Sequence, residues 1–202
     1  MSNTKKVGQD YEKAGDGAWI EYFGQYLNAI WCMLDISKKR KYPEADEIVL
    51  PLLLLFAQYM ELWIKTITLN YGIGNEGGAL LTGHKILELK EDFLQLLGEK
   101  EHFIYQKDLE RIFMLYAKLD LLTNEGVSLS EAARYPVTSK GEKTLNAEWA
   151  DDLCEGCGVD ALPIIKIGEE LLMLTENVYD SIYESRVHSE KIGSGECLNE
   201  YL

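Results

Sequence analysis

Hydrophobic residues recur every three or four positions along most of the chain, and the longest such run is Leu52–Tyr71. This spacing predicts an α-helix that is apolar around most of its circumference. Such a helix must be enclosed by other helices, so we expect it to be the central helix of a bundle. Its predicted buried positions are Leu52, Leu53, Leu55, Phe56, Tyr59, Met60, Trp63, Ile64 and Ile67.

A narrow polar stripe runs along the same segment and consists of Gln58, Glu61, Lys65 and Thr68. Glu61 precedes Lys65 by four residues, which is the order that favours an ion pair along a helix. If exposed, such a pair contributes about 0.2–0.5 kcal/mol to helix stability. Pro51 either opens the regular part of this helix or kinks a longer helix that begins near Ala45.

Four further segments show helical periodicity: 16–38, 85–97, 107–122 and the stretch from Pro163 onward. Asp16 and Thr82 are suitable N-cap residues, and Gly98 is suited to ending a helix. The predicted inward positions are Ile20, Phe23, Leu27, Ile30 and Leu34; Ile86, Leu89, Phe93 and Leu97; Leu109, Ile112, Phe113, Tyr116 and Leu119; and Ile164, Ile167, Leu171, Leu174, Val178 and Ile182.

Four aromatic residues flank the inward stripe of the first helix: Trp19, Tyr22, Tyr26 and Trp31. Core packing accounts for them better than base stacking, because stacking platforms normally have basic neighbours. If this aromatic face is exposed, it provides a seam for a homodimer.

These segments predict an all-α protein, an up-and-down bundle of four to five helices. Residues 123–161 lack sustained periodicity and form a long irregular loop before the last helix, a length that often carries function. We expect residues 1–15 to be a flexible arm, 16–190 to be a single helical domain, and 191–202 to be a loose tail.

The chain is acidic, with 34 Asp and Glu residues against 20 Lys and Arg residues and a net charge of −14. This balance excludes a uniformly basic nucleic-acid binder and gives no support to RNA as a partner. Four consecutive cations, Lys38, Lys39, Arg40 and Lys41, are either a solvated turn or a local phosphate-binding patch. Residues 1–8 lack the apolar core of a signal peptide, and no later segment is predicted to cross a membrane, so we expect a cytoplasmic protein.

Cys154 and Cys157 have the C-x-x-C spacing that lets two thiolates bind one zinc ion. A closed structural zinc site needs four ligands, and Cys32, Cys197 and the three histidines are scattered. Two free thiols in a reducing compartment are therefore favoured over a metal or redox role, and no cofactor is expected.

Candidate catalytic residues are few. His84 lies where a loop meets a helix, and Arg186 and His188 are near the end of the last helix. Two positions apart on a helix, these last two side chains point about 200° from each other, so they do not converge on one phosphate unless the helix has ended before them. No dinucleotide fingerprint or nucleophile elbow is present.

Three segments, in this order, resemble HEPN domains (higher eukaryote and prokaryote nucleotide-binding). Glu61-Leu-Trp-Ile-Lys65 is similar to their Glu–Lys helix, and Gly83-His84-Lys85-Ile86-Leu87-Glu88-Leu89 resembles the segment that opens their next helix. Arg134-Tyr135-Pro136, followed by Gly141, resembles the stretch that leads into their final helix. The resemblance covers about residues 16–188.

The resemblance implies a helical bundle, often a homodimer, that belongs to a bacterial toxin–antitoxin, abortive-infection or other antiviral defence system. Active members are metal-independent RNases in which four to six residues separate an Arg from the His that follows it. This chain lacks that interval: Arg40, Arg111 and Arg134 have no His in range, and Arg186-Val-His188 is too short. His84 and Arg134 match family positions, and we expect both to be scaffold residues.

We therefore predict a non-catalytic, HEPN-like binding protein that acts through contacts with a second copy or another protein. One alternative is an endoribonuclease with a rearranged site built from His84, Arg134, Arg186 or His188 across a dimer. Another is an adaptor stabilised by zinc on Cys154 and Cys157.

Overall fold

The computed structural model describes residues 16–39, 48–70, 85–98, 106–135, 139–146 and 161–193. These residues form α2 (Asp16–Lys39), α3 (Val49–Asn70), α4 (Ile86–Gly98), α5 (Gln106–Asp120), the one-turn helix α6 (Leu129–Ala132) and α8 (Ala161–Gly193). Within these ranges no β-strand occurs, and the pairing of Thr123 with Leu145 is an isolated antiparallel bridge. The prediction of an all-α fold is confirmed.

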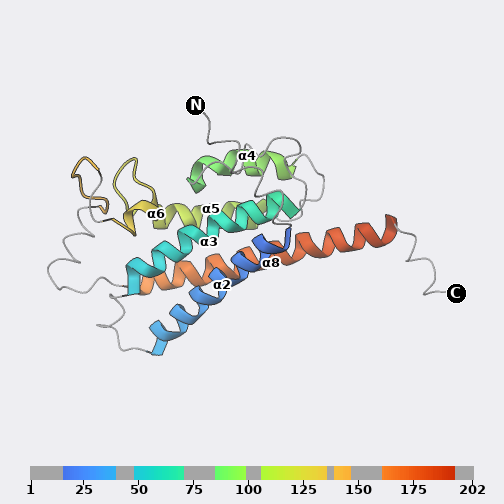
Figure 1. The fold of residues 1–202 in the computed structure, drawn as a ribbon, viewed down its shortest axis with the longest axis horizontal. Helices are drawn as coiled ribbons and strands as arrows, with labels where there is room; N and C mark the ends of the chain where they lie inside the picture. The colour runs from blue at the N-terminus through green and yellow to red at the C-terminus, as the bar shows by residue number, and fades with distance from the viewer. Residues whose placement is uncertain are drawn as a thin grey trace.

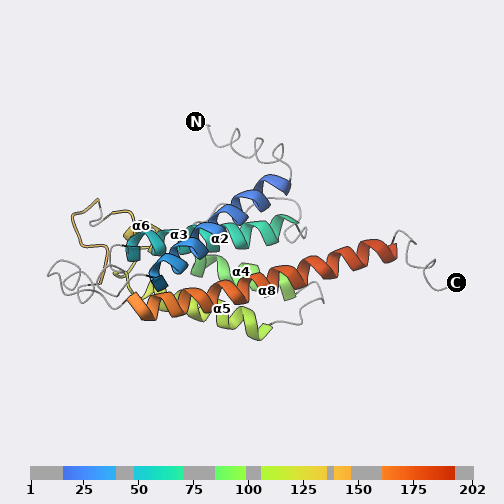
Figure 2. The same ribbon diagram turned by 90° about the horizontal axis from the view of Figure 1, so that it is seen from below.

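Consecutive long helices pack against one another, α2 on α3, α3 on α4, α4 on α5 and α5 on α8 (Figure 1). The last helix, α8, closes the bundle by also contacting α2 and α3. Its C-terminal end projects beyond the other helices in both views (Figures 1 and 2). α3 contacts α2, α4, α6 and α8, so it is the central helix that its hydrophobic pattern predicts.

Most of α3 is buried, as its sequence requires. Of the nine predicted inward positions, only Leu55 is partly exposed. By length and composition α3 could also cross a membrane, a criterion that buried core helices of soluble proteins share. Pro51 lies within its first turn, where proline is tolerated because the N–H groups there have no partner inside the helix.

The polar stripe of α3 is more enclosed than an exposed helix surface. The Gln58 side chain donates a hydrogen bond to Ser130 Oγ of α6 at 3.1 Å. Glu61 and Lys65 form an ion pair, and their side chains are only 13% and 7% exposed. Thr68 is buried and donates to the carbonyl oxygen of Ile64. The Glu61–Lys65 pair therefore lies inside the bundle, where removing one member would leave the charge of the other buried without compensation.

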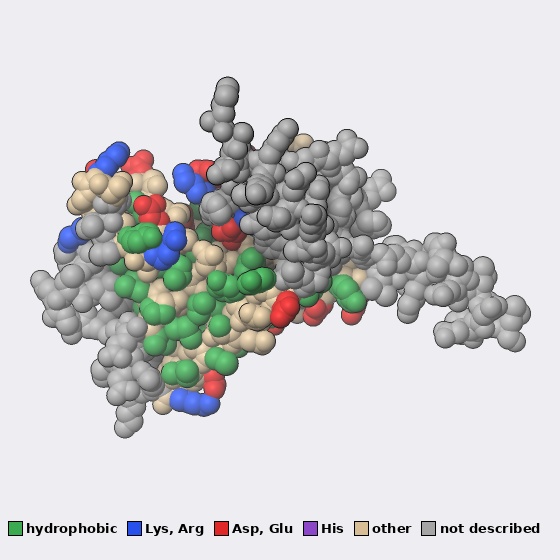
Figure 3. All heavy atoms as spheres, in the orientation of Figure 1, with side chains coloured by type: hydrophobic (Ala, Val, Ile, Leu, Met, Phe, Trp, Pro, Cys, Tyr) green, Lys and Arg blue, Asp and Glu red, His purple; other side chains and the backbone are tan. Residues whose placement is uncertain are grey.

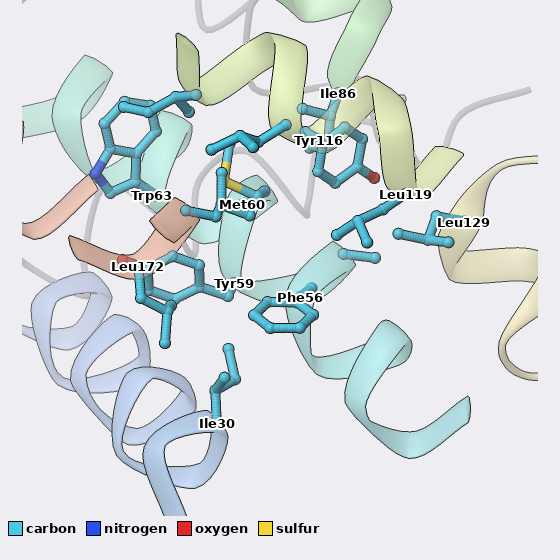
Figure 4. Packing of buried hydrophobic residues seen from close by; sticks show 14 of the residues in the cluster. Ile30, Phe56, Tyr59, Met60, Trp63, Ile86, Tyr116, Leu119, Leu129 and Leu172 are labelled. Carbon is cyan, nitrogen blue, oxygen red and sulfur yellow. The ribbon is translucent and has the colours of Figure 1, made fainter. Parts of the chain in front are cut away.

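A polar connection inside the core links α3 to α8. The hydroxyl groups of Tyr59 and Thr175 are 2.7 Å apart, and the indole nitrogen of Trp63 donates to the carbonyl oxygen of Thr175 at 3.0 Å. Figure 4 shows the Tyr59 and Trp63 side chains within the core. Burial raises the pKa of Tyr59, so this phenol stays neutral. Phe23 of α2 stacks on Tyr59 with ring centroids 5.2 Å apart, which brings the first helix onto the same core.

α8 lies very close to α3 at Gly168. A Cβ added to this glycine would lie 2.0 Å from Cζ of Phe56. No carbon atoms approach this closely in a folded protein, so the ring of Phe56 fills the space that any other residue at position 168 would need.

The predicted inward residues of α4 and α5 are all buried. In α8, Ile167, Leu174 and Ile182 are only partly buried, whereas Ile165 and Leu172 are buried although they were not predicted. The reason is that α8 packs on α5, α3 and α2 together, so its buried arc is wider than a single stripe.

In α2, Ile20 was predicted to face inward but is 40% exposed, and Leu27 is only partly buried. Phe23, Ile30 and Leu34 are buried as predicted.

Part of the predicted irregular segment has defined structure. Ser128 caps α6 by accepting a hydrogen bond from the Glu131 N–H, and α6 packs on α3. Asn124 N–H bonds the carbonyl oxygen of Thr144, which closes the loop between them. Residues 1–15, 147–160 and 194–202 lie outside the described residues, and α8 continues to Gly193, past the predicted boundary at 190.

Candidate functional site

A pocket of about 170 Å³ lies between the start of α4, the C-terminal end of α5 and the loop that precedes α6. Its described lining residues are Lys85, Ile86, Leu87, Glu88, Tyr116, Asp120, Gly126, Val127 and Ser128. Gly126 has a φ of 81°, which lets the chain turn back toward α5 immediately after that helix ends. The pocket thus combines residues that are about 30 positions apart in sequence.

Tyr116 contributes a hydroxyl group to the pocket. The residue as a whole is 3% exposed, and its hydroxyl is not one of the fully buried oxygens that lack a hydrogen bond in the described part of the chain. Figure 4 shows its ring beside Ile86 and Leu119, with the hydroxyl at the end of the ring that lies away from Trp63. Burial raises the pKa of Tyr116, and the negative charges of Asp120 and Glu61 raise it further, so the phenol is neutral at physiological pH.

Asp120 contributes a half-buried carboxyl group. Its Oδ1 accepts a hydrogen bond from the Leu129 N–H at 3.2 Å, and no cation in the described part of the chain pairs with it. Burial raises the pKa of the Asp120 carboxyl, and the Leu129 hydrogen bond offsets this only in part. At the rim, the Lys85 ammonium is 2.9 Å from the Glu88 carboxylate.

Changing Asp120 to Asn is expected to raise the free energy of unfolding at pH 7 by less than about 1 kcal/mol, because solvent screens a half-buried carboxyl. A raised pKa in the folded state means that folding disfavours the charged form of Asp120. Removing the charge therefore increases the free energy of unfolding at pH values above that pKa. The gain disappears as the pH falls below the unfolded value of about 3.9. Urea unfolding at pH 7 and at pH 3 measures the gain in stability and its loss at low pH. An Asp120→Asn variant that is less stable than the unmodified protein at pH 7 would contradict a raised pKa of the Asp120 carboxyl.

Among the described lining residues, the Ser128 hydroxyl caps α6, Lys85 pairs with Glu88 and the Tyr116 phenol is neutral. No three His, Cys, Asp or Glu side chains in the described residues are grouped to hold a metal ion. What the lining offers is recognition: an acceptor carboxylate, a hydroxyl group and an apolar wall.

A second feature is an apolar surface on α2. Tyr22, Tyr26, Ala29, Met33 and Ile36 recur at helical spacing beside the buried face of the helix, and we call these residues the α2 stripe. Tyr22 is 60% and Ile36 45% exposed, and the other three are partly exposed. Figure 3 shows hydrophobic side chains gathered on the face of the molecule formed by α2 and α3.

Of the predicted catalytic residues, the structure describes the side chain of Arg134 alone. Its Nε donates to the carbonyl oxygen of Ser130 at 3.0 Å, and its guanidinium lies over the Tyr135 ring. Arg134 therefore closes the end of α6, and its role as a scaffold residue stays a prediction. His84 lies outside the described residues, as do Cys154 and Cys157, and of Arg186 and His188 only the helical backbone is described.

In the predicted phosphate-binding run, Lys38 pairs with Glu169 of α8 at 2.5 Å and Lys39 pairs with Asp35. Both lysines are therefore already engaged with carboxylates. Arg40 and Lys41 lie outside the described residues, and the phosphate-binding patch stays a prediction.

The sequence predictions missed the pocket. They included a dimer seam on the first helix, if its aromatic face with Tyr22 and Tyr26 is exposed, but not Ala29, Met33 and Ile36. The full stripe had a signal, since its five residues follow the i, i+4, i+7, i+11, i+14 pattern of a second apolar face. The pocket had none, because only the fold brings Tyr116 and Asp120 near Lys85 and Gly126.

No protein-family description, no curated protein and no solved structure matches this chain.

Proposed function

We propose that this chain is a non-catalytic helical binding protein, and that two copies associate through the α2 stripe. The observation that carries the proposal is the exposure of Tyr22 and Ile36 at the two ends of the stripe, with Tyr26, Ala29 and Met33 partly exposed between them, although Tyr26 and Met33 also pack on the core. Contiguous exposed apolar surface of this kind marks interaction sites in water-soluble proteins.

The stripe suits pairing with a helix of the same sequence. It contains no charged side chain, so two stripes can meet without burying an unpaired charge. Ala29 lies near its centre, and a small residue there lets two helix backbones approach. Two tyrosines and a methionine supply the large, adaptable contacts that are enriched at interfaces.

The charges beside the stripe favour an antiparallel pair. Glu21 and Lys39 are 18 residues apart, which is five helical turns, so both lie on the same edge of the helix. Their midpoint is residue 30, next to Ala29. When two α2 helices cross there in opposite directions, Glu21 of each copy meets Lys39 of the other. A parallel pair does not bring these charges together, and it also aligns the two helix dipoles.

The resemblance of the 61–65, 83–89 and 134–136 segments to HEPN domains supports the same proposal, since such domains often form homodimers. On that basis we propose a role in a bacterial defence or stress module, exercised by binding another protein or copy. The absence of the Arg-x(4–6)-His interval favours binding over RNA cleavage.

The test is the mass in solution, measured by size-exclusion chromatography with light scattering. The unmodified protein should show twice the chain mass of 23.0 kDa, and Tyr22→Glu with Ile36→Glu should show 23.0 kDa. Because each copy carries a charge of −14, raising the ionic strength should strengthen the association by screening repulsion.

Tyr183→Glu is the matched control, because Tyr183 is a 54% exposed aromatic residue on α8, outside the stripe. It should leave the dimer intact. Circular dichroism of each variant establishes that the helices are retained. A monomeric unmodified protein, or a dimer that survives the double α2 change, would rule out the proposal.

A further inference from the structure

We infer that the pocket between α4, α5 and the 126–128 loop binds a small organic cation, a primary ammonium group on a short alkyl chain. This inference does not depend on the pairing of α2. It rests on three properties of the pocket: its size, the hydroxyl group and the carboxylate in its lining, and the sign of the surrounding charge.

The size sets the class of ligand. A cavity of about 150 Å³ is large enough to hold benzene, so about 170 Å³ suits a ligand of similar size. Ile86, Leu87 and Val127 provide an apolar wall that can cover an alkyl chain. The pocket is too small for a nucleotide or a folded peptide segment to enter whole.

The polar groups set the chemistry of the head group. The Tyr116 hydroxyl can accept a hydrogen bond from a ligand that enters the pocket. Asp120, one helical turn further along α5, accepts a hydrogen bond from the Leu129 N–H and has no described counter-cation. An ammonium group can donate to both at once, whereas a carboxylate or phosphate ligand would be repelled by Asp120.

The charges near the pocket point the same way. Lys85 is neutralised by Glu88, and the charge of Glu131 also acts on it. Glu61, whose charge acts on Tyr116, is balanced by Lys65. Asp120 and Glu131 are therefore left in excess, and a cationic ligand would supply the missing positive charge.

The experiment is a titration of the full chain with n-butylammonium chloride and, separately, with n-butanol at the same ionic strength. Two-dimensional NMR of the backbone amides follows each titration. We expect saturable shifts of the amides around Asp120 and Val127, with a dissociation constant of about 1 mM as befits so small a ligand, and no saturation with the alcohol.

Asp120→Asn should weaken ammonium binding by at least about tenfold, because it removes the charge and keeps an oxygen for the Leu129 N–H. Tyr116→Phe, which removes only the hydroxyl, should weaken it by about threefold or more. Glu125→Gln is the matched control, since Glu125 is exposed in the same loop and does not line the pocket, and it should leave binding unchanged.

A third titration, with Nα-acetyl-lysine amide, identifies the source of the ammonium group. Binding of this compound together with butylammonium indicates a lysine side chain, and binding of butylammonium alone indicates a free amine. Equal binding of butanol and butylammonium, unchanged affinity in Asp120→Asn, or no saturable binding to the unmodified protein would overturn the inference.

Discussion

Gly168→Ala is expected to lower the free energy of unfolding by about 2 kcal/mol, although alanine is the better helix former. Removing a glycine from a helix interior contributes about 1 kcal/mol in favour of folding. The added Cβ, however, would lie 2.0 Å from Phe56 Cζ, and overfilling a packed core costs about 1–3 kcal/mol or more. The collision is therefore expected to outweigh the gain in helix propensity.

Thermal and urea unfolding measure this change, and a chain of this length should lose about 4–8 °C in Tm. Gly24→Ala is the matched control, because no atom lies within 4 Å of the added Cβ, and it should leave stability unchanged or improve it. In a Phe56→Leu background the cost of Gly168→Ala should shrink, since the ring is gone. Equal effects of the two glycine changes would show that α3 and α8 are not in close contact at this point.

The second large effect is expected for Glu61→Gln, with a loss of about 3 kcal/mol in the free energy of unfolding. The change keeps the shape of the side chain but leaves the Lys65 ammonium, which is only 7% exposed, without this counter-charge. Removing one member of a buried ion pair typically costs about 3–5 kcal/mol, because the other charge stays desolvated.

The double change Glu61→Gln with Lys65→Met should recover much of the loss, because no unpaired charge then remains inside the bundle. Glu88→Gln is the comparison, since Glu88 and Lys85 form an exposed pair and its loss should cost less than about 0.5 kcal/mol. Urea unfolding of all three variants gives the values. If the single change at Glu61 costs no more than the change at Glu88, the pair on α3 is in effect solvent-exposed.

The helices of this protein could be predicted from sequence wherever one face alone meets the core. In α4 and α5 the apolar residues keep a regular spacing, and all nine predicted inward positions are buried. Prediction of the buried set was less complete in α2, where Ile20 is 40% exposed, and in α8, which packs on α5, α3 and α2. Ile165 and Leu172 of α8 show the wider buried arc, since both are buried outside the predicted stripe.

The environment of the polar stripe could not be predicted, since it depends on a contact 72 positions away. Gln58 bonds Ser130, and α6, a helix of four residues, is too short to show periodicity. The same limit applies to the pocket. The sequence pattern predicts Tyr116 as a core residue of α5, but this residue also lines a pocket bounded by α4 and the 126–128 loop. The α2 stripe, in contrast, can be recognised in the sequence as a second set of apolar residues at helical spacing.

Disulfide cross-linking tests the pairing of α2 most directly. In a chain whose four native cysteines are changed to serine, Ala29→Cys should oxidise rapidly to a covalent dimer, because the two central positions of an antiparallel pair face each other. Tyr22→Cys in the same background should stay monomeric on denaturing gels, since its two copies would lie about 20 Å apart along the helices. Efficient cross-linking at position 22, or none at position 29, would contradict the antiparallel dimer.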